Sequence, residues 1–190
     1  MQQLAKLNAQ ICELARQAGE KIMNFYKDTG EVTWKKDASP LTAADNASHD
    51  FLTKSLRSLS AGIPVISEES IETARDIGTT NRFWLVDPLD GTKEFLKGTD
   101  EFTVNIAPIE CGQPVLGVVH APALDLTYCG LQNSGCWRRA GDQSPRAISS
   151  RRADSSQLSV VASKDHAGPR GAGDVDACTT GGRTVDGKCA

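Results

Sequence analysis

Two amphipathic stretches open the chain. Apolar residues recur every three or four positions from Leu4 to Tyr26 and charged residues occupy the opposite face, so this segment predicts a helix with one buried side. Thr42 is followed by Asp45 three positions later, which is the spacing of a capping box, and apolar residues then continue at helical spacing to about Ser60. The pattern therefore predicts a second helix that begins at Thr42.

The middle of the chain has a different pattern, in which short apolar runs are separated by glycine, proline, asparagine and aspartate. Such runs are typical of strands, and turns of hairpin length between them indicate an antiparallel sheet. The expected strands are Ile63–Ile66, Phe83–Val86, Phe102–Ile109, Val115–Ala121, Leu126–Gly130, Cys136–Arg138 and Leu158–Ala162. A short strand is also expected after Val32, and a helical turn at Lys93–Gly98. The predicted fold class is α+β, with two helices and an antiparallel sheet.

The regular pattern stops near residue 168. From Gly168 to Ala190 the chain is rich in glycine and contains no leucine, isoleucine or aromatic residue. Such a segment cannot bury enough apolar surface to order itself. We therefore expect one domain over residues 1–167 and a flexible, non-native tail over residues 168–190.

The composition favours a globular protein, because 39% of the 190 residues are hydrophobic. The formal net charge is -3 and the pI is about 5.6, so nucleic-acid binding is not expected. No run approaches the length of a membrane span and the first residues do not resemble a secretion signal, which favours the cytoplasm. The six cysteines lack the CxxC spacing of zinc sites. Cys12, Cys111, Cys129 and Cys136 are expected to be core thiols.

Acidic residues stand at the ends of two predicted strands. Glu68 and Glu69 follow the first strand, and Asp87 and Asp90 follow the second, on either side of Pro88. Clustered carboxylates suit hard divalent cations, which an acidic protein could use to bind an anionic substrate. Two plainer interpretations stay open, namely acid pairs on a solvated surface and a strand-turn-helix corner whose aspartates cap the next helix.

The acids belong to three motifs that follow one another along the chain, Asp37–Asp45, Ser67–Ser70 and Trp84–Thr92. Together they resemble the magnesium-dependent, lithium-sensitive phosphatases of the inositol monophosphatase superfamily. The branch that the chain resembles most is the bacterial CysQ-type 3'(2'),5'-bisphosphate nucleotidases, through Asp90–Phe95, Glu101–Ile106 and Leu116–Pro122. The resemblance covers roughly Leu4 to His166 and implies a layered α/β sandwich, here mainly its N-terminal half.

The resemblance implies a metal site for about two or three Mg²⁺ ions. The implied ligands are the side chains of Glu68, Asp87 and Asp90 and the backbone carbonyl of Leu89. Glu69 and Asp37 are weaker candidates beside this set.

The same resemblance implies catalytic residues. Asp45 and Thr92, together with Glu68, would orient and activate an attacking water, whereas a purely capping role for Asp45 is the plainer interpretation. The backbone amides of Gly91 and Thr92 would receive the substrate phosphate at the start of a helix.

The implied activity is removal of the 3'-phosphate from 3'-phosphoadenosine 5'-phosphate, also called adenosine 3',5'-bisphosphate, to give AMP and phosphate. The implied enzyme is a cytoplasmic monomer or homodimer. An alternative location is a peripheral position on the cytoplasmic face of the inner membrane. One alternative is an inositol or sugar monophosphate phosphatase. Another is a truncated, inactive metal-binding fragment, because the WDxAAG-like motif that supplies a last metal ligand in the family does not follow Trp137, the last tryptophan.

Overall fold

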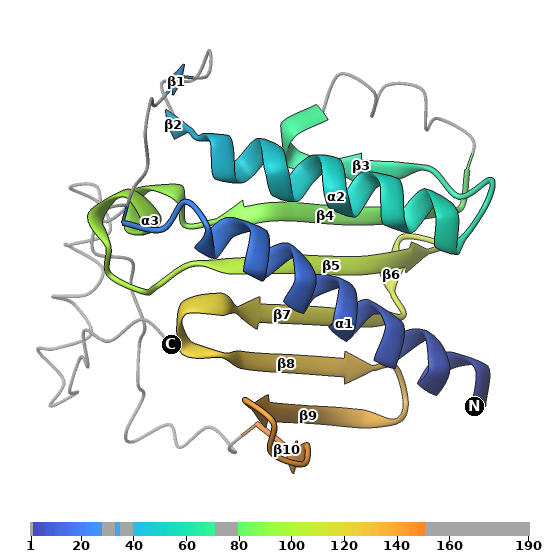
Figure 1. Cartoon of the computed structure of the whole chain (residues 1–190). Coiled ribbons are helices and arrows are strands. Elements are labelled where there is room, and N and C mark those ends of the chain that lie inside the picture. The colour runs from blue at the N-terminus through green and yellow to red at the C-terminus, as the bar shows by residue number, and fades with distance from the viewer. Residues whose placement is uncertain (1, 28–32, 35–39, 71–79, 151–190) are drawn as a thin grey trace, which may run out of the picture. The chain divides into compact units, whose positions relative to one another are not determined.

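The structure is a computed structural model of the chain, and it describes residues 2–27, 33–34, 40–70 and 80–150 (Figure 1). The described fold belongs to the unit Met1–Ser149. Three of the predictions lie outside the described residues: the strand Leu158–Ala162, the domain boundary at residue 167 and a role for Asp37.

An eight-stranded sheet forms the body of this unit, in the order β10-β9-β8-β7-β5-β4-β3, with β6 paired to β5. The strands are β3 (Val65–Ser67), β4 (Arg82–Asp90), β5 (Thr103–Glu110), β6 (Gln113–Pro114), β7 (Leu116–Ala121), β8 (Leu126–Leu131), β9 (Gly135–Ala140) and β10 (Arg146–Ile148). Neighbouring strands are antiparallel, as predicted, except that β3 and β4 run parallel. The chain returns to β4 through residues 68–81, a long enough connection for a parallel crossover.

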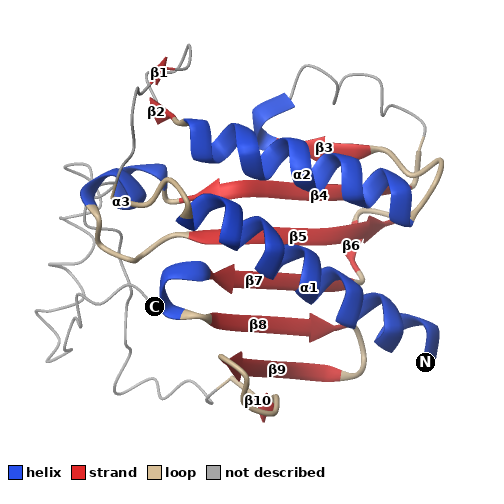
Figure 2. Cartoon of the chain, viewed as in Figure 1, coloured by secondary structure: helices blue, strands red, loops and turns tan. Residues whose placement is uncertain are grey.

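Two helices, α1 (Gln2–Met23) and α2 (Ala43–Leu59), lie side by side on one face of this sheet (Figures 1 and 2). Helix α1 packs on β5, β7 and β8, and α2 packs on β3 and β4. Alternate residues of the strands point toward the helices, which confirms both helices and the alternating strand pattern. The core between the layers includes Ile11, Ala15, Ile22, Leu52, Leu56, Trp84, Val86, Val104, Ile106 and Val118.

The other face of the sheet carries apolar side chains with substantial exposure. Leu85 is 46% exposed, Val119 is 40% exposed and Tyr128 is 39% exposed. Val119 and Tyr128 are paired across β7 and β8. The described unit therefore has one helix-covered sheet face and one face that is only partly buried.

Shorter elements complete the unit. Strand β1 (Thr33–Trp34) pairs with β2 (Pro40–Leu41), a single turn of 3-10 helix spans Pro122–Leu124, and α3 (Thr92–Lys97) follows β4. The sequence pattern missed β6 and β10, because their residues are exposed and too few to show alternation. It also missed β2, a strand of two residues that begins at a proline. It also ended β4 at Val86, four residues early.

The expectation that four cysteines are core thiols is wrong for two of them. Cys111 and Cys136 are exposed, because one lies in the turn after β5 and the other points away from the helices. Cys12 and Cys129 are partly buried.

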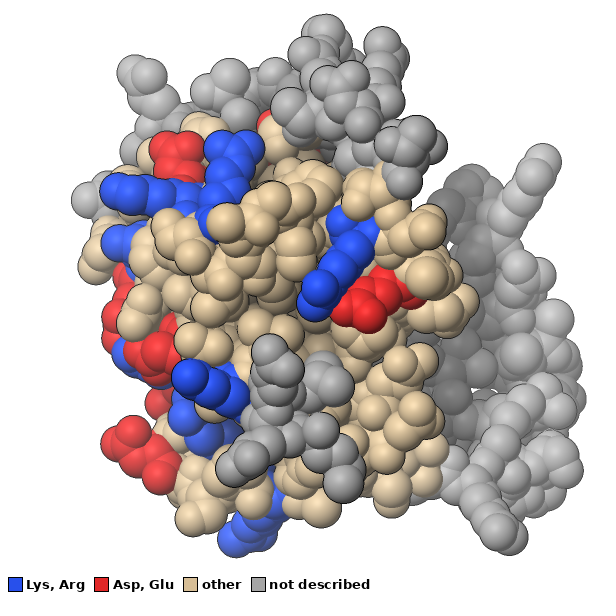
Figure 3. Space-filling view, turned by 90° about the vertical axis from the view of Figure 1, so that its right-hand side faces the viewer, with Lys and Arg blue, Asp and Glu red and all other residues tan. Residues whose placement is uncertain are grey.

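Charged side chains of both signs are interspersed on the face of the molecule drawn in Figure 3. Among the described residues of that face, Lys and Arg are therefore not gathered into the extended basic surface that is typical of nucleic-acid binding. Among the helices that the structure describes, none combines the length and apolar character needed to cross a bilayer.

Helix α1 lies very close to the end of β7 at Gly19. A Cβ atom there would lie 2.8 Å from Pro122 Cβ and 2.9 Å from two atoms of the His120 ring. The ring is 2% exposed and its Nδ1 atom is 3.0 Å from Thr127 Oγ1, so it cannot move aside freely. Only glycine fits this crossing without a shift of the helix.

We expect Gly19→Ala to lower the free energy of unfolding by about 1–3 kcal/mol, because overpacking outweighs the better helix propensity of alanine. Urea denaturation measures this change. Gly117→Ala on β7 is the matched control, since no atom lies within 4 Å of its added Cβ. Equal stability of the two variants would contradict the close crossing at Gly19.

Candidate active site

The candidate site lies where β3 and β4 end at the same edge of the sheet. Their parallel register places Ser67 opposite Val86, so the next residues, Glu68 and Asp87, follow at the same edge of the sheet, where β3 has ended and β4 continues to Asp90. Glu68 begins a short helical turn and is exposed, whereas Asp87 is partly buried. Two acids that are distant in sequence therefore meet because two buried strands run in the same direction.

Asp87 is electrostatically strained in this position. Burial, together with the negative charges of Glu68 and Asp90, raises the pKa of Asp87 from 3.8 to about 8, and a hydrogen bond between Asp87 and Glu68 acts in the same direction. A bond from the backbone of Leu89 opposes the shift only in part. Among the described residues, no donor reaches the buried Oδ1 atom of Asp87. A cation would remove both the repulsion and the unpaired oxygen.

Asp90 is set by an irregularity in β4. The register between β4 and β5 shifts between Asp87 and Asp90, as in a β-bulge. The side chain of Asn105 donates to Asp90 Oδ2 at 3.1 Å, and Thr103 Oγ1 donates to Asn105 Oδ1 at 3.1 Å. This chain of hydrogen bonds fixes the Asp90 carboxylate, which is on the exposed end of the strand.

Helix α2 supports the same bulge through a hydrogen bond. The hydroxyl of Ser48 donates to the carbonyl of Pro88 at 2.8 Å, and Ser48 is fully buried. Pro88 has no N–H group for the sheet, so a bulge is a natural place for it. The hydrogen bond ties the segment between the two aspartates to the helix.

Gly91 makes the sharp turn from β4 into α3. Its φ angle is +91°, and a Cβ atom would lie 2.9 Å from the carbonyl oxygen of Glu101. Both the backbone conformation and the close approach require glycine. The turn delivers Thr92, the first residue of α3, beside helix α2.

Asp45 and Thr92 meet where the first turn of α2 lies beside the start of α3. Thr92 Oγ1 donates to Asp45 Oδ1 at 3.2 Å, and it lies 3.3 Å from the carbonyl oxygen of Leu89. The second oxygen of Asp45 accepts from the backbone and the hydroxyl of Thr42, at 2.7 and 2.5 Å, and completes the predicted capping box. Asp45 is fully buried. It both caps helix α2 and accepts a hydrogen bond from Thr92.

The donor set suits a hard divalent cation only in part. Carboxylate and carbonyl oxygens are the ligands that Mg²⁺ prefers, and Glu68, Asp87 and Leu89 bring such oxygens to one edge of the sheet. Within residues 2–27, 33–34, 40–70 and 80–150, however, no group of three or more His, Cys, Asp or Glu side chains is arranged to hold a metal ion. Asp90 lies close enough to Asp87 to raise its pKa, and Asn105 engages only the Oδ2 atom of Asp90, so the ligand set of Glu68, Asp87 and Asp90 stays a prediction.

The structure thus brings together two pairs of predicted residues, Glu68 with Asp87 and Asp45 with Thr92. The sequence interpretation missed the supporting residues Ser48, Asn105 and His49, whose Nδ1 atom lies 2.8 Å from Ser67 Oγ. Asn105 lies directly opposite Asp87 in the β4–β5 ladder. Knowledge of the residue pairing between β4 and β5 would have identified Asn105, but the sequence alone does not give this pairing.

Comparison with known proteins gives consistent matches along most of the chain. The profile described as the inositol monophosphatase family matches residues 3–174. A 3'(2'),5'-bisphosphate nucleotidase CysQ from Salmonella typhimurium is 49% identical over 131 residues, which are 68% of this chain and 53% of the relative. A CysQ from Escherichia coli O6:H1 is 43% identical over 160 residues, which are 83% of this chain and 63% of the relative.

A solved structure has the same fold. It is CysQ from Bacteroides thetaiotaomicron, described as a bacterial member of the inositol monophosphatase family, with a TM-score of 0.73 and 30% identity. The match covers 90% of this chain and 68% of that one. The layered α+β architecture predicted from the sequence is confirmed. The chain spans 53% to 63% of the length of the curated relatives described above.

The raised pKa of Asp87 predicts a metal-dependent response to pH. Between about pH 4 and pH 8 the unfolded chain has lost this proton while the folded chain retains it, so folding without metal becomes less favourable as pH rises. We expect the melting temperature in EDTA to fall by roughly 5 °C across this range, and saturating Mg²⁺ to reverse the fall.

Asp87→Asn is the control for this response, because the amide has the same shape and no charge. Its melting temperature should depend less on pH and should not rise with Mg²⁺. Differential scanning fluorimetry at pH 5 and pH 8 measures both effects. A variant with the same pH slope and the same Mg²⁺ response as the wild type would assign them to other groups.

Proposed function

Because the chain belongs to the inositol monophosphatase family, we propose that it carries the reacting centre of a metal-dependent phosphatase. The proposed reaction is hydrolysis of the 3'-phosphate of adenosine 3',5'-bisphosphate to AMP and phosphate. The names of the relatives that are 43% and 49% identical support this substrate. The proposed cofactor is Mg²⁺, and the proposed location is the cytoplasm. The homodimer stays a prediction.

One observation carries the proposal: the partly buried hydrogen bond from Thr92 to Asp45 lies beside the segment that bears Asp87 and Leu89. A hydroxyl that donates to a carboxylate keeps its lone pairs available to accept a hydrogen bond from water. Asp45 is already oriented by Thr42, so it presents one oxygen to Thr92 in a fixed direction. The arrangement is suited to positioning a water and receiving its proton.

The residues divide the work of the reaction between them. The carboxylates of Glu68 and Asp87 and the carbonyl of Leu89 would hold the cations, which when bound neutralise phosphate charge and acidify the attacking water. Thr92 accepts a hydrogen bond from that water and relays its proton to Asp45 as the oxygen attacks phosphorus. The bond from phosphorus to the 3'-oxygen breaks on the opposite side, and the leaving oxygen takes a proton from solvent.

The bulge in β4 supports this division of work. Ser48 fixes the Pro88 carbonyl and Asn105 fixes Asp90, so the oxygens on either side of the bulge are held by different elements. Gly91 then turns the chain so that Thr92 reaches Asp45. Preorganised groups of this kind need not reorganise when charge develops at the phosphate.

The first test is phosphate release from adenosine 3',5'-bisphosphate and from inositol monophosphate, with Mg²⁺ or EDTA. We expect release from the nucleotide that requires Mg²⁺ and exceeds release from inositol monophosphate at least tenfold. The reverse preference would support the inositol phosphatase instead. Mg²⁺-dependent thermal stabilisation without release from either ester would identify a metal-binding fragment that has no turnover.

The second test replaces the hydroxyl at Thr92. Thr92→Val keeps the shape and removes the donor to Asp45, so we expect kcat to fall by about 10²–10⁴-fold. Thr92→Ser keeps the hydroxyl and should retain activity within about tenfold of the wild type. Steady-state kinetics on the nucleotide measures both variants. Similar kcat values for valine and serine would exclude Thr92 from the proton path.

A further inference from the structure

A second site lies between the first half of α1 and the strands β8 and β9, which the proposed phosphatase reaction does not use. It is a pocket of about 390 Å³, and none of the metal-ligand candidates lines it. Its lining brings two thiols from different elements together, Cys12 of α1 and Cys129 of β8, with Asn8, Trp137 and Arg139 around them. Figure 1 shows α1 passing over β8.

The side chain of Asn8 links the two thiols and gives them different roles. Cys12 Sγ donates to Asn8 Oδ1 at 3.7 Å, and Asn8 Nδ2 donates to Cys129 Sγ at 3.7 Å. Cys12 is therefore the thiol that keeps its proton, and Cys129 is the sulfur that accepts hydrogen bonds. A sulfur that only accepts hydrogen bonds is stabilised as the thiolate.

The surroundings of Cys129 act in the same direction. The neighbouring Cys12 thiol, followed by hydrogen bonds from Asn8 and the Trp137 backbone and the charge of Arg139, lowers the pKa of Cys129, although burial opposes the shift. The hydrogen bond with Cys129 and burial raise the pKa of Cys12. The pocket thus favours the thiolate form of Cys129 and the neutral form of Cys12.

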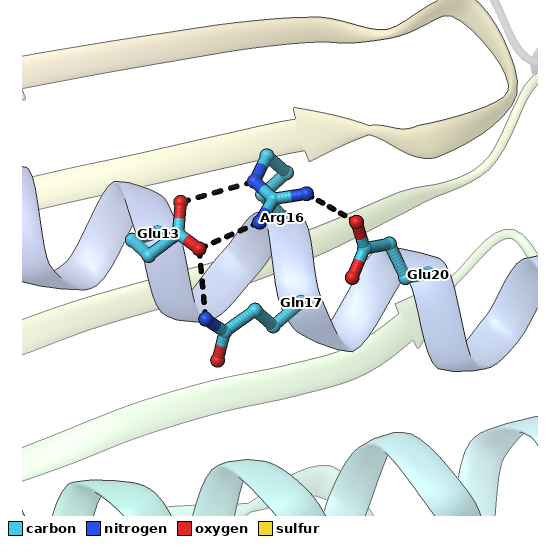
Figure 4. Close-up of polar contacts among 4 residues, drawn as sticks. All are labelled: Glu13, Arg16, Gln17 and Glu20. Carbon is cyan, nitrogen blue, oxygen red and sulfur yellow. Dashed lines mark hydrogen bonds and ion pairs between the residues drawn. The ribbon is translucent and has the colours of Figure 1, made fainter.

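One carboxylate also lines the pocket, and it is already engaged on α1. Arg16 donates to both oxygens of Glu13, at 3.0 and 2.6 Å, and Gln17 donates to Glu13 at 2.7 Å (Figure 4). Arg16 also bonds Glu20 on its other side. The charge of Glu13 is therefore compensated within the helix, so it repels a thiolate or an anionic reagent less strongly.

We propose that Cys129 and Cys12 are a dithiol site that a low-molecular-weight disulfide oxidises. The Cys129 thiolate attacks the disulfide RSSR, forms a mixed disulfide with one half and releases the other half as RS⁻. Cys12 then loses its proton to RS⁻ and attacks the Cys129 sulfur, which releases the second RS⁻, protonated by solvent. The protein dithiol becomes a Cys12–Cys129 disulfide, and one RSSR is reduced to two RSH.

We expect the disulfide reagent to react faster with a partly buried cysteine than with the exposed ones. Cys111 and Cys136 are exposed, whereas Cys12 and Cys129 are partly buried. Relative to an ordinary thiol, the lowered pKa of Cys129 gives it a larger thiolate fraction and a lower intrinsic nucleophilicity, and the gain in thiolate fraction grows as the pH falls toward 6. Experiments at pH 6 therefore separate the proposed site from surface cysteines.

The test treats the reduced whole chain with oxidised glutathione at pH 6 and maps its cysteines by peptide mass spectrometry. The wild type should form a Cys12–Cys129 cross-link, lose two hydrogens and retain no glutathione there. Cys12→Ser should stop with one glutathione on Cys129, formed several times faster than on Cys111 or Cys136. Cys129→Ser should leave Cys12 unmodified.

Asn8→Ala tests the linking side chain without touching either sulfur, and we expect it to slow modification of Cys129 severalfold. The map of modified cysteines in the wild-type protein tests the proposal by itself, even if one of the variants misfolds. Retention of glutathione on wild-type Cys129, a cross-link through another pair of cysteines, or faster modification of Cys111 or Cys136 would overturn the proposal.

Discussion

The parallel pairing of β3 with β4 is the constraint on which the candidate site depends. Every other neighbouring pair in the described sheet is antiparallel, and antiparallel neighbours end at opposite edges. Only a parallel pair could place Glu68 and Asp87 at one edge after two buried strands. Helix α2 then covers this pair, and its buried Ser48 and Asp45 reach down to the segment that leaves β4.

Much of the fold could be predicted from the chain because its elements have strong periods. The apolar positions of α1 recur over six turns, and the capping box marks the start of α2, so the sequence predicts both helices. It does not predict the end of β4, because Pro88 and two aspartates are poor strand formers and the strand continues through a bulge. Contacts with α2 and β5 determine the conformation of that stretch, and local strand propensity does not reflect such contacts.

The candidate site could be predicted as a set of residue types but not as a set of partners. The acids were evident from three motifs, whereas the bond from Asn105 to Asp90 depends on the register between β4 and β5. The same limit explains the pocket of Cys12 and Cys129, which are 117 positions apart and meet only because α1 crosses β8. Contacts across layers contain no short-range signal that a sequence pattern could reveal.

Asp45 has two tasks, since one oxygen begins α2 and the other orients Thr92. Selection for folding alone would therefore keep aspartate at this position, even in a lineage whose copies no longer turn over substrate. Glu68 is exposed and contributes to the repulsion around Asp87, so folding alone would not protect it. After a loss of turnover these two acids would diverge at different speeds, and the order of their replacement along a lineage would record when the chemistry stopped.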